Sequence, residues 1–130
     1  SMPDQYKTVS LEEFVEYSKS MFAYWTEDDF ASSFRKMLTI EQFRSEEMQG
    51  LYQQYLSSGP AAYVKDLFES MGIAHAEENA VRFYATMYFY YSVYDGADDK
   101  EKVKNEFAST IGSMAQEWIK QPKLTQIRKS

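Results

Sequence analysis

The sequence has 130 residues, a formal net charge of −6 and no cysteine, and its only histidine is His75. That length suits one domain that can bury a core without covalent cross-links. The absence of cysteine excludes disulfides and thiolate metal sites, and a single histidine excludes an imidazole-rich metal site within one chain. The acidic balance has the wrong sign for holding nucleic-acid phosphates, so we expect this chain by itself not to bind DNA.

The longest uncharged run, residues 83–94, is rich in tyrosine and much shorter than the roughly 20 apolar residues that a membrane span needs. We therefore expect no membrane partner and a cytoplasmic location. Ser1 precedes Met2, which predicts that residues 1–9 are a tag remnant and linker. Residues 10–121 carry the helical patterning, and residues 122–130 form a basic tail that we interpret as a solvated terminus.

The first two helices are predicted from capping signals and apolar spacing. Ser10 and Glu13 form a capping box, and the apolar residues that follow recur on one face, which predicts a helix over residues 11–25. Thr26 is the expected N-cap of the next helix, because acidic residues follow it in the first turn, and that helix ends around residues 40–43.

Two shorter helices follow. Ser45 is the expected N-cap of a short amphipathic helix that includes residues 48–56. Gly59 suits a left-handed position after that helix, and Pro60 suits the first turn of another helix over residues 61–71.

The last two predicted helices are long and cover residues 79–95 and 99–120, the second capped by Asp98. Each has an apolar face beside a flatter face of small residues, so each is expected to need neighbours on two sides. No segment alternates with a period of two, which predicts an all-α fold, a single helical bundle of about six helices.

The apolar face of the 79–95 helix has two possible roles, a filled core or the wall of a ligand cavity. Aromatic and methionine side chains with a few hydroxyl groups suit a small, mostly apolar or aromatic effector, and they also suit a plain core. The candidate ligand-binding residues are Phe22, Trp25, Phe34, Met37, Tyr63, Phe68, Phe83, Tyr84, Met87 and Tyr91.

The small-residue faces predict a homodimer. Two consecutive helices with such faces can pack as a hairpin against their symmetry mates, giving a dimeric four-helix bundle. The candidate dimer-interface residues are Ala85, Tyr88, Phe89, Ser92, Ala108, Ile111, Gly112, Ala115 and Ile119.

Residues for catalysis are not apparent, and we expect no enzymatic activity, no cofactor and no metal. Covalent catalysis would need a nucleophile beside a base, and His75 falls in a predicted turn. No glycine-rich phosphate loop, nucleotide fingerprint or Glu-x-x-His pair occurs in the sequence.

One segment resembles a known family. Residues 35–56, RKMLTIEQFRSEEMQGLYQQYL, resemble the corresponding stretch in the C-terminal domain of TetR-family (tetracycline-repressor-like) transcriptional regulators. The order and length of the helices are also similar over residues 11–120. The matching positions are Leu38, Thr39, Glu41, Phe43 and Arg44, followed by Met48, Leu51, Tyr52 and Tyr55.

The resemblance implies a homodimer formed through the last two helices, a cavity for a small-molecule effector, and repression relieved by that effector. It also implies an N-terminal helix-turn-helix domain, which this chain lacks, so DNA would be contacted only through that missing domain. The alternative interpretation is a stand-alone helical protein-interaction module with a filled core.

Overall fold

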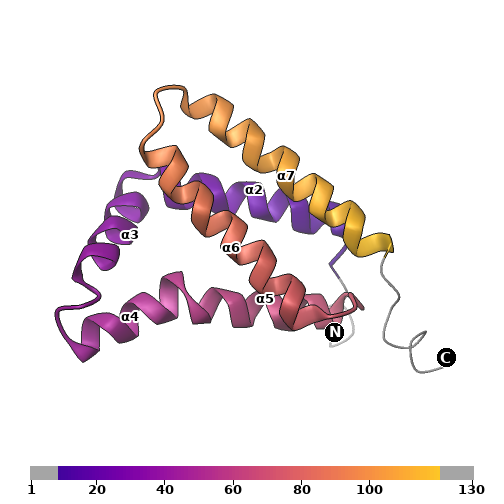
Figure 1. The fold of residues 1–130 in the computed structure, drawn as a ribbon, viewed down its shortest axis with the longest axis horizontal. Coiled ribbons are helices and arrows are strands. Elements are labelled where there is room, and N and C mark those ends of the chain that lie inside the picture. Colours follow the sequence, from indigo (N-terminus) through magenta and orange to yellow (C-terminus); the bar gives the residue numbers. More distant parts are fainter. Residues whose placement is uncertain (1–8, 121–130) are drawn as a thin grey trace, which may run out of the picture.

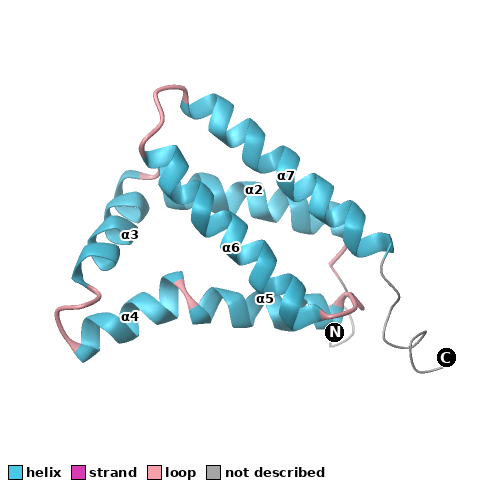
Figure 2. Cartoon of the chain, in the orientation of Figure 1, coloured by secondary structure: helices cyan, strands magenta, loops and turns pink. Residues whose placement is uncertain are grey.

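The computed structural model describes residues 9–120, which form a bundle of six helices joined by short loops (Figure 1). No strand occurs in this part of the chain (Figure 2), so the predicted all-α single-domain bundle is confirmed. The predicted linker, apart from Val9, and the predicted basic tail lie outside the described residues. The helices are α2 (Leu11–Glu27), α3 (Asp29–Glu41), α4 (Glu46–Leu56), α5 (Ser58–Ser70), α6 (Ala76–Asp95) and α7 (Lys100–Lys120).

Helix α6 crosses the middle of the bundle, with α2 behind it and α7 returning beside it in the opposite direction (Figure 1). Helices α4 and α5 follow each other along one edge, and α3 joins the end of α2 to the start of α4. Contacts link α6 to α2, α5 and α7, which agrees with its central position. Helix α6 is therefore packed against three other helices of the same chain.

The capping predictions at Ser10 and Ser45 are confirmed. The backbone N–H of Glu13 donates to Ser10 Oγ at 3.0 Å, and the Glu13 carboxylate accepts from the Ser10 N–H at 2.9 Å. The N–H of Met48 donates to Ser45 Oγ at 3.2 Å. These bonds satisfy backbone donors that the first turn of a helix leaves without partners.

Two other capping predictions are wrong by one or two residues. Thr26 is buried inside α2, where its hydroxyl donates to the Phe22 carbonyl oxygen at 2.6 Å, a bond that threonine can make within a helix. The cap of α3 is Asp28, which accepts from the Ala31 N–H at 2.8 Å. At α7, Asp99 rather than Asp98 accepts from the N–H of Lys102, at 3.1 Å.

The junction between α4 and α5 also differs from the prediction. The chain bends at Ser57, and Gly59 lies inside α5 rather than in a left-handed position. A Cβ atom at Gly59 would clash with the Gln54 carbonyl oxygen, so the close approach of the backbones requires glycine there. Pro60 occupies the first turn of α5, as predicted.

The core has one large cluster and one small one. The large cluster joins α2, α5, α6 and α7, and the small one consists of Leu38, Tyr52 and Leu56 from α3 and α4. Trp25, at the end of α2, packs against both clusters. The bundle is therefore continuous across the end of α2.

Candidate functional site

A cavity of about 250 Å³ lies between α2, the junction of α4 and α5, and the inner face of α6. Six of the ten candidate ligand-binding residues line it, namely Trp25, Tyr63, Phe83, Tyr84, Met87 and Tyr91. The aromatic face of α6 therefore borders an open space over part of its length.

The other four candidates lie away from this cavity. Phe22 is buried in the large cluster, its ring stacked 4.3 Å from that of Phe107, and Phe68 is 0% exposed. Phe34 packs against the small cluster, and Met37 is 38% exposed on the outside of α3. Helical spacing predicts that all four side chains lie on apolar stripes of their helices. It does not show which neighbouring helix each stripe contacts.

The cavity is also lined by seven residues outside the predicted ligand-binding set: Tyr17, Met21, Gln54, Tyr55, Gly59, Pro60 and Val64. Tyr17, Met21 and Trp25 follow one another at intervals of four residues along α2, so this second stripe was detectable from the sequence. Gly59 and Pro60 were interpreted only as a helix boundary, which concealed their place in the wall.

Three tyrosine hydroxyls connect α6 to α4. The Tyr84 hydroxyl donates to the Leu56 carbonyl oxygen at 2.6 Å, and the hydroxyls of Tyr52 and Tyr88 are hydrogen-bonded to each other. Burial, together with the hydrogen bond to Tyr88, raises the pKa of Tyr52 to about 12. Burial, followed by the neighbouring Tyr88 and Tyr52 hydroxyls, raises the pKa of Tyr84. The phenols of Tyr52 and Tyr84 are therefore neutral near pH 7.

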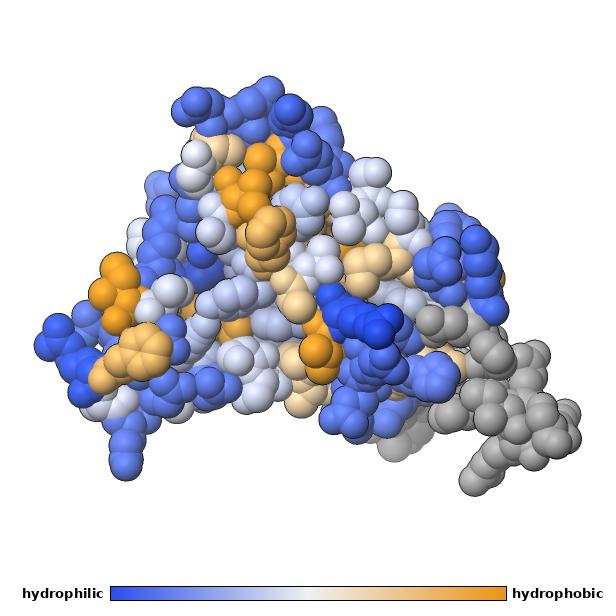
Figure 3. All heavy atoms as spheres, in the orientation of Figure 1, coloured by the Kyte–Doolittle hydropathy of each residue, from blue (hydrophilic) through white to orange (hydrophobic). Residues whose placement is uncertain are grey.

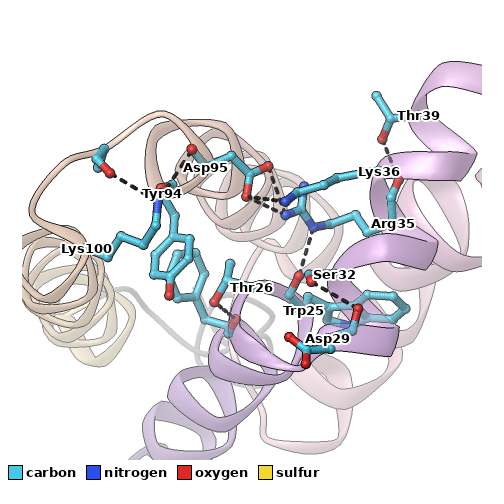
Figure 4. A network of polar contacts seen from close by, with 12 residues as sticks. Trp25, Thr26, Asp29, Ser32, Arg35, Lys36, Thr39, Tyr94, Asp95 and Lys100 are labelled. Atoms are coloured by element: carbon cyan, nitrogen blue, oxygen red, sulfur yellow. Dashed lines mark hydrogen bonds and ion pairs between the residues drawn. The ribbon is translucent and has the colours of Figure 1, made fainter.

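The ion pair between the buried Arg35 and the partly exposed Asp95 was not predicted from the sequence (Figure 4). Arg35 is 6% exposed, and its Nη2 donates to Asp95 Oδ1 and Oδ2 at 2.8 and 3.0 Å. Its Nε donates to the Trp25 carbonyl oxygen at 2.9 Å, and its guanidinium carbon lies 4.9 Å from the centre of the Tyr91 ring. Arg35 thus holds the ends of α2 and α6 against α3 and supports two cavity residues.

The sequence contained one signal for this ion pair. Arg35 lies at helical spacing between Ala31 and Leu38, both of which are buried. A charged residue in such a stripe needs a partner when it is buried. The partner, Asp95, is 60 residues away and was interpreted only as the end of α6.

The outer face of α6 carries the first four candidate dimer residues. Ala85 and Ser92 are exposed, Tyr88 is 37% exposed and Phe89 is 60% exposed. Apolar side chains follow α6 on the face seen in Figure 3. A groove of about 570 Å³ runs along this face, and Tyr52, Leu56 and Ala61 contribute its other wall.

On α7 the prediction is partly wrong. Ile119 is 59% exposed, and Ala108 and Gly112 are half-buried, so these three can contact a partner. Ile111 and Ala115 are 0% and 4% exposed within their own chain. They continue the stripe of Phe107 and Trp118 at helical spacing, so they belong to the core and cannot form an interface.

Other kinds of site have little support in the described residues. Residues 9–120 contain no cluster of three or more acidic, histidine or cysteine side chains that could hold a metal ion. None of the described helices combines the length and apolarity that a membrane crossing requires. In comparisons with known proteins, no family model, curated protein or solved structure matched the chain. The TetR resemblance therefore stays a prediction drawn from the residues quoted above.

Proposed function

We propose that this chain is the small-molecule-sensing and homodimerisation domain of a TetR-like transcriptional regulator that contacts DNA through a domain outside this chain. The observation that carries the proposal is the position of α6 between two apolar surfaces. Its inner face lines the 250 Å³ cavity, and its outer face lines the exposed groove. Tyr84 lines both, so the cavity and the outer face share a side chain.

The composition of the outer face supports the dimer. Residues 83–94 contain no charged side chain, even at positions that face outward in the single chain. A helix on the surface of a monomer normally carries charge on its outer face, and an exposed apolar strip usually marks an interface. A stable homodimer interface typically buries about 1,600 Å² or more in total, so we expect the exposed sides of both α6 and α7 to take part.

The sensing mechanism would use α2 as the moving element. Trp25 brings α2 to the cavity, and its carbonyl oxygen is held by Arg35, which also binds Asp95 at the end of α6. An effector that contacts Trp25 would favour one position of α2 against α6 and change the spacing of two attached DNA-binding domains. A coupling free energy of about 1–3 kcal/mol would be ordinary for such a switch.

The dimer is tested by one pair of variants with matched chemistry. Phe89 and Phe43 are both exposed phenylalanines, at 60% and 85%, but Phe43 lies between α3 and α4, away from α6. We expect the unchanged chain to sediment as a dimer, Phe89→Asp as a monomer, and Phe43→Asp as a dimer. A monomer at every concentration for the unchanged chain would overturn the dimer.

The alternative is a protein-interaction module that uses the same groove for a different partner. The exposed groove along α6 supports an interaction module as much as it supports a sensing dimer. The cavity supports only the sensing domain. Adding a small molecule that binds within the cavity distinguishes the sensing domain from the interaction module. If binding within the cavity leaves both the dimer and a tethered DNA-binding domain unaffected, the interaction module is favoured.

A further inference from the structure

The walls of the cavity carry no net charge. Its lining residues are aromatic, aliphatic or amide side chains, with no lysine, arginine, aspartate or glutamate among those described. The guanidinium carbon of Arg35 lies 4.9 Å from the centre of the Tyr91 ring, but Arg35 does not line the cavity and is already paired with Asp95. Moving an ion from water into such surroundings would cost several kcal/mol without a partner. The cavity therefore selects against charged ligands.

One cavity residue has an unused hydrogen-bonding group. Tyr91 is 3% exposed, yet within the described part of the chain its hydroxyl makes no hydrogen bond, while the nearby Tyr84 hydroxyl is bonded to Leu56. No fully enclosed polar side-chain atom among the described residues lacks a partner. The Tyr91 oxygen must therefore border open space, and the cavity is the space that Tyr91 lines.

A ligand that fills the cavity takes the Tyr91 O–H away from water, so a ligand that supplies an acceptor avoids the cost of leaving that donor without a partner. Burial, followed by the Tyr84 hydroxyl, raises the pKa of Tyr91 well above its ordinary value, so the donor keeps its proton. The aromatic side chains of Trp25, Tyr63 and Phe83 line the cavity, and such side chains pack favourably against an aromatic ring.

From these three observations we propose that the cavity takes an uncharged aromatic compound of one or two rings, and that one oxygen of that compound, such as a carbonyl, accepts a hydrogen bond from Tyr91. The size agrees with a small compound, because the 250 Å³ volume lies just below the range of about 300–1,000 Å³ typical of pockets that hold drug-sized ligands. This inference rests on the proposed function, since it takes the cavity as the ligand site.

Three probes of one shape test the inference: naphthalene, 2-acetylnaphthalene and 2-naphthoate, titrated calorimetrically near neutral pH. The unchanged chain should bind 2-acetylnaphthalene most tightly and naphthoate most weakly. Tyr91→Phe removes only the unpaired hydroxyl, so the variant should fold normally. It should bind 2-acetylnaphthalene about 3- to 10-fold more weakly, with the affinity for naphthalene unchanged.

Tyr55→Phe is the matched control, since Tyr55 lies in the same wall but is 41% exposed to solvent. Its affinity for 2-acetylnaphthalene should stay within about twofold of the original.

The outcomes separate this inference from the proposed function. If naphthoate binds as tightly as the ketone, or if Tyr91→Phe weakens naphthalene and the ketone equally, the ligand class is wrong while the cavity remains a ligand site. If neither naphthalene nor the ketone binds the unchanged chain, the cavity is not a ligand site and the sensing function falls with it. Should Tyr91→Phe be unstable, the affinity ratio of ketone to naphthalene in the unchanged chain decides, and a ratio of one or less overturns the inference.

Discussion

Aromatic side chains line the inner face of α6 along most of its length, but the two ends of that face are packed differently. At the Phe83 end, the rings of Phe14, Phe68, Phe83 and Trp118 lie with centroids 4.6 to 6.3 Å apart and fill the space. Phe83 also forms the near edge of the cavity, and from there past Tyr84 and Met87 to Tyr91 the same face borders open space. Opposite the filled end, α2 and α5 present large rings. Opposite the hollow end, the chain turns from α4 into α5, where Gly59 and Pro60 contribute little side chain. The residues that face α6, rather than α6 itself, decide where the bundle is open.

The largest expected effect on stability comes from truncating one buried side chain at the filled end and one at the hollow end of the inner face of α6. Phe68 is 0% exposed in the filled end, so Phe68→Ala should lower the free energy of unfolding by about 3–5 kcal/mol. Met87 is 5% exposed beside the cavity, and Met87→Ala should cost about 2 kcal/mol, near the lower limit for such changes. Tyr63→Ala, at the 55% exposed rim, is the control and should cost under about 1 kcal/mol. Urea denaturation measures all three, and equal losses at Phe68 and Met87 would contradict the comparison.

The ion pair behind the hollow end should have the next largest effect. Asp95→Ala leaves the buried Arg35 without its carboxylate, and we expect a loss of about 2–3 kcal/mol, less than for a fully enclosed pair because the Asp95 side chain is 27% exposed. Arg35→Met combined with Asp95→Ala should recover part of that loss in a double-mutant cycle. Lys36 lies 4.0 Å from Asp95 but is 54% exposed, so Lys36→Ala should change stability little. If Asp95→Ala is as stable as the unchanged chain, the ion pair does not stabilise the part of the fold that surrounds the cavity.

A smaller effect is expected at the boundary between the cavity and the outer groove. Tyr84→Phe removes the donor to the Leu56 carbonyl oxygen and should cost about 1–2 kcal/mol in thermal or urea unfolding. Tyr91→Phe removes a hydroxyl from the same cavity that makes no described hydrogen bond, so it should cost less. If the two substitutions cost the same, the Tyr84 bond does not help to hold α6 against α4.

The smallest expected effect is a pH dependence above pH 10. The pKa of Tyr52 is raised from 10.0 to about 12 in the folded chain, so the unfolded phenol ionises first. The stabilisation is therefore complete below about pH 10 and is lost as pH rises towards about 12. Comparing urea midpoints at about pH 8 and about pH 11 should show a larger drop for the unchanged chain than for Tyr52→Phe, which cannot ionise. Equal drops would show that Tyr52 titrates normally.

Most of the fold was predictable because capping residues and apolar spacing act locally. The six helices and the caps at Ser10 and Ser45 agree with the structure. The errors at Thr26 and Asp98 have local causes as well, since a threonine can bond within a helix and two adjacent aspartates compete for one cap.

The candidate site was less predictable because it depends on which helices face each other. Six cavity residues were found from the aromatic face of α6 and its neighbours, but Phe22 and Phe68 have the same chemistry and are core. Arg35 and Asp95 are 60 residues apart, and no local pattern joins them. Ile111 and Ala115 were assigned outward because a stripe of small residues and a core stripe overlap on α7.

The close backbone contact at Gly59 bears on how this cavity can change size. Any side chain there would meet the Gln54 carbonyl oxygen, so the α4–α5 bend would have to open or straighten to accept it. Because Gly59 and Pro60 are themselves part of the wall, that movement would widen or collapse the chamber without altering any ring inside it. One backbone position can thus change the size of the cavity, while substitutions among the tyrosines that line it would change the polarity of its walls.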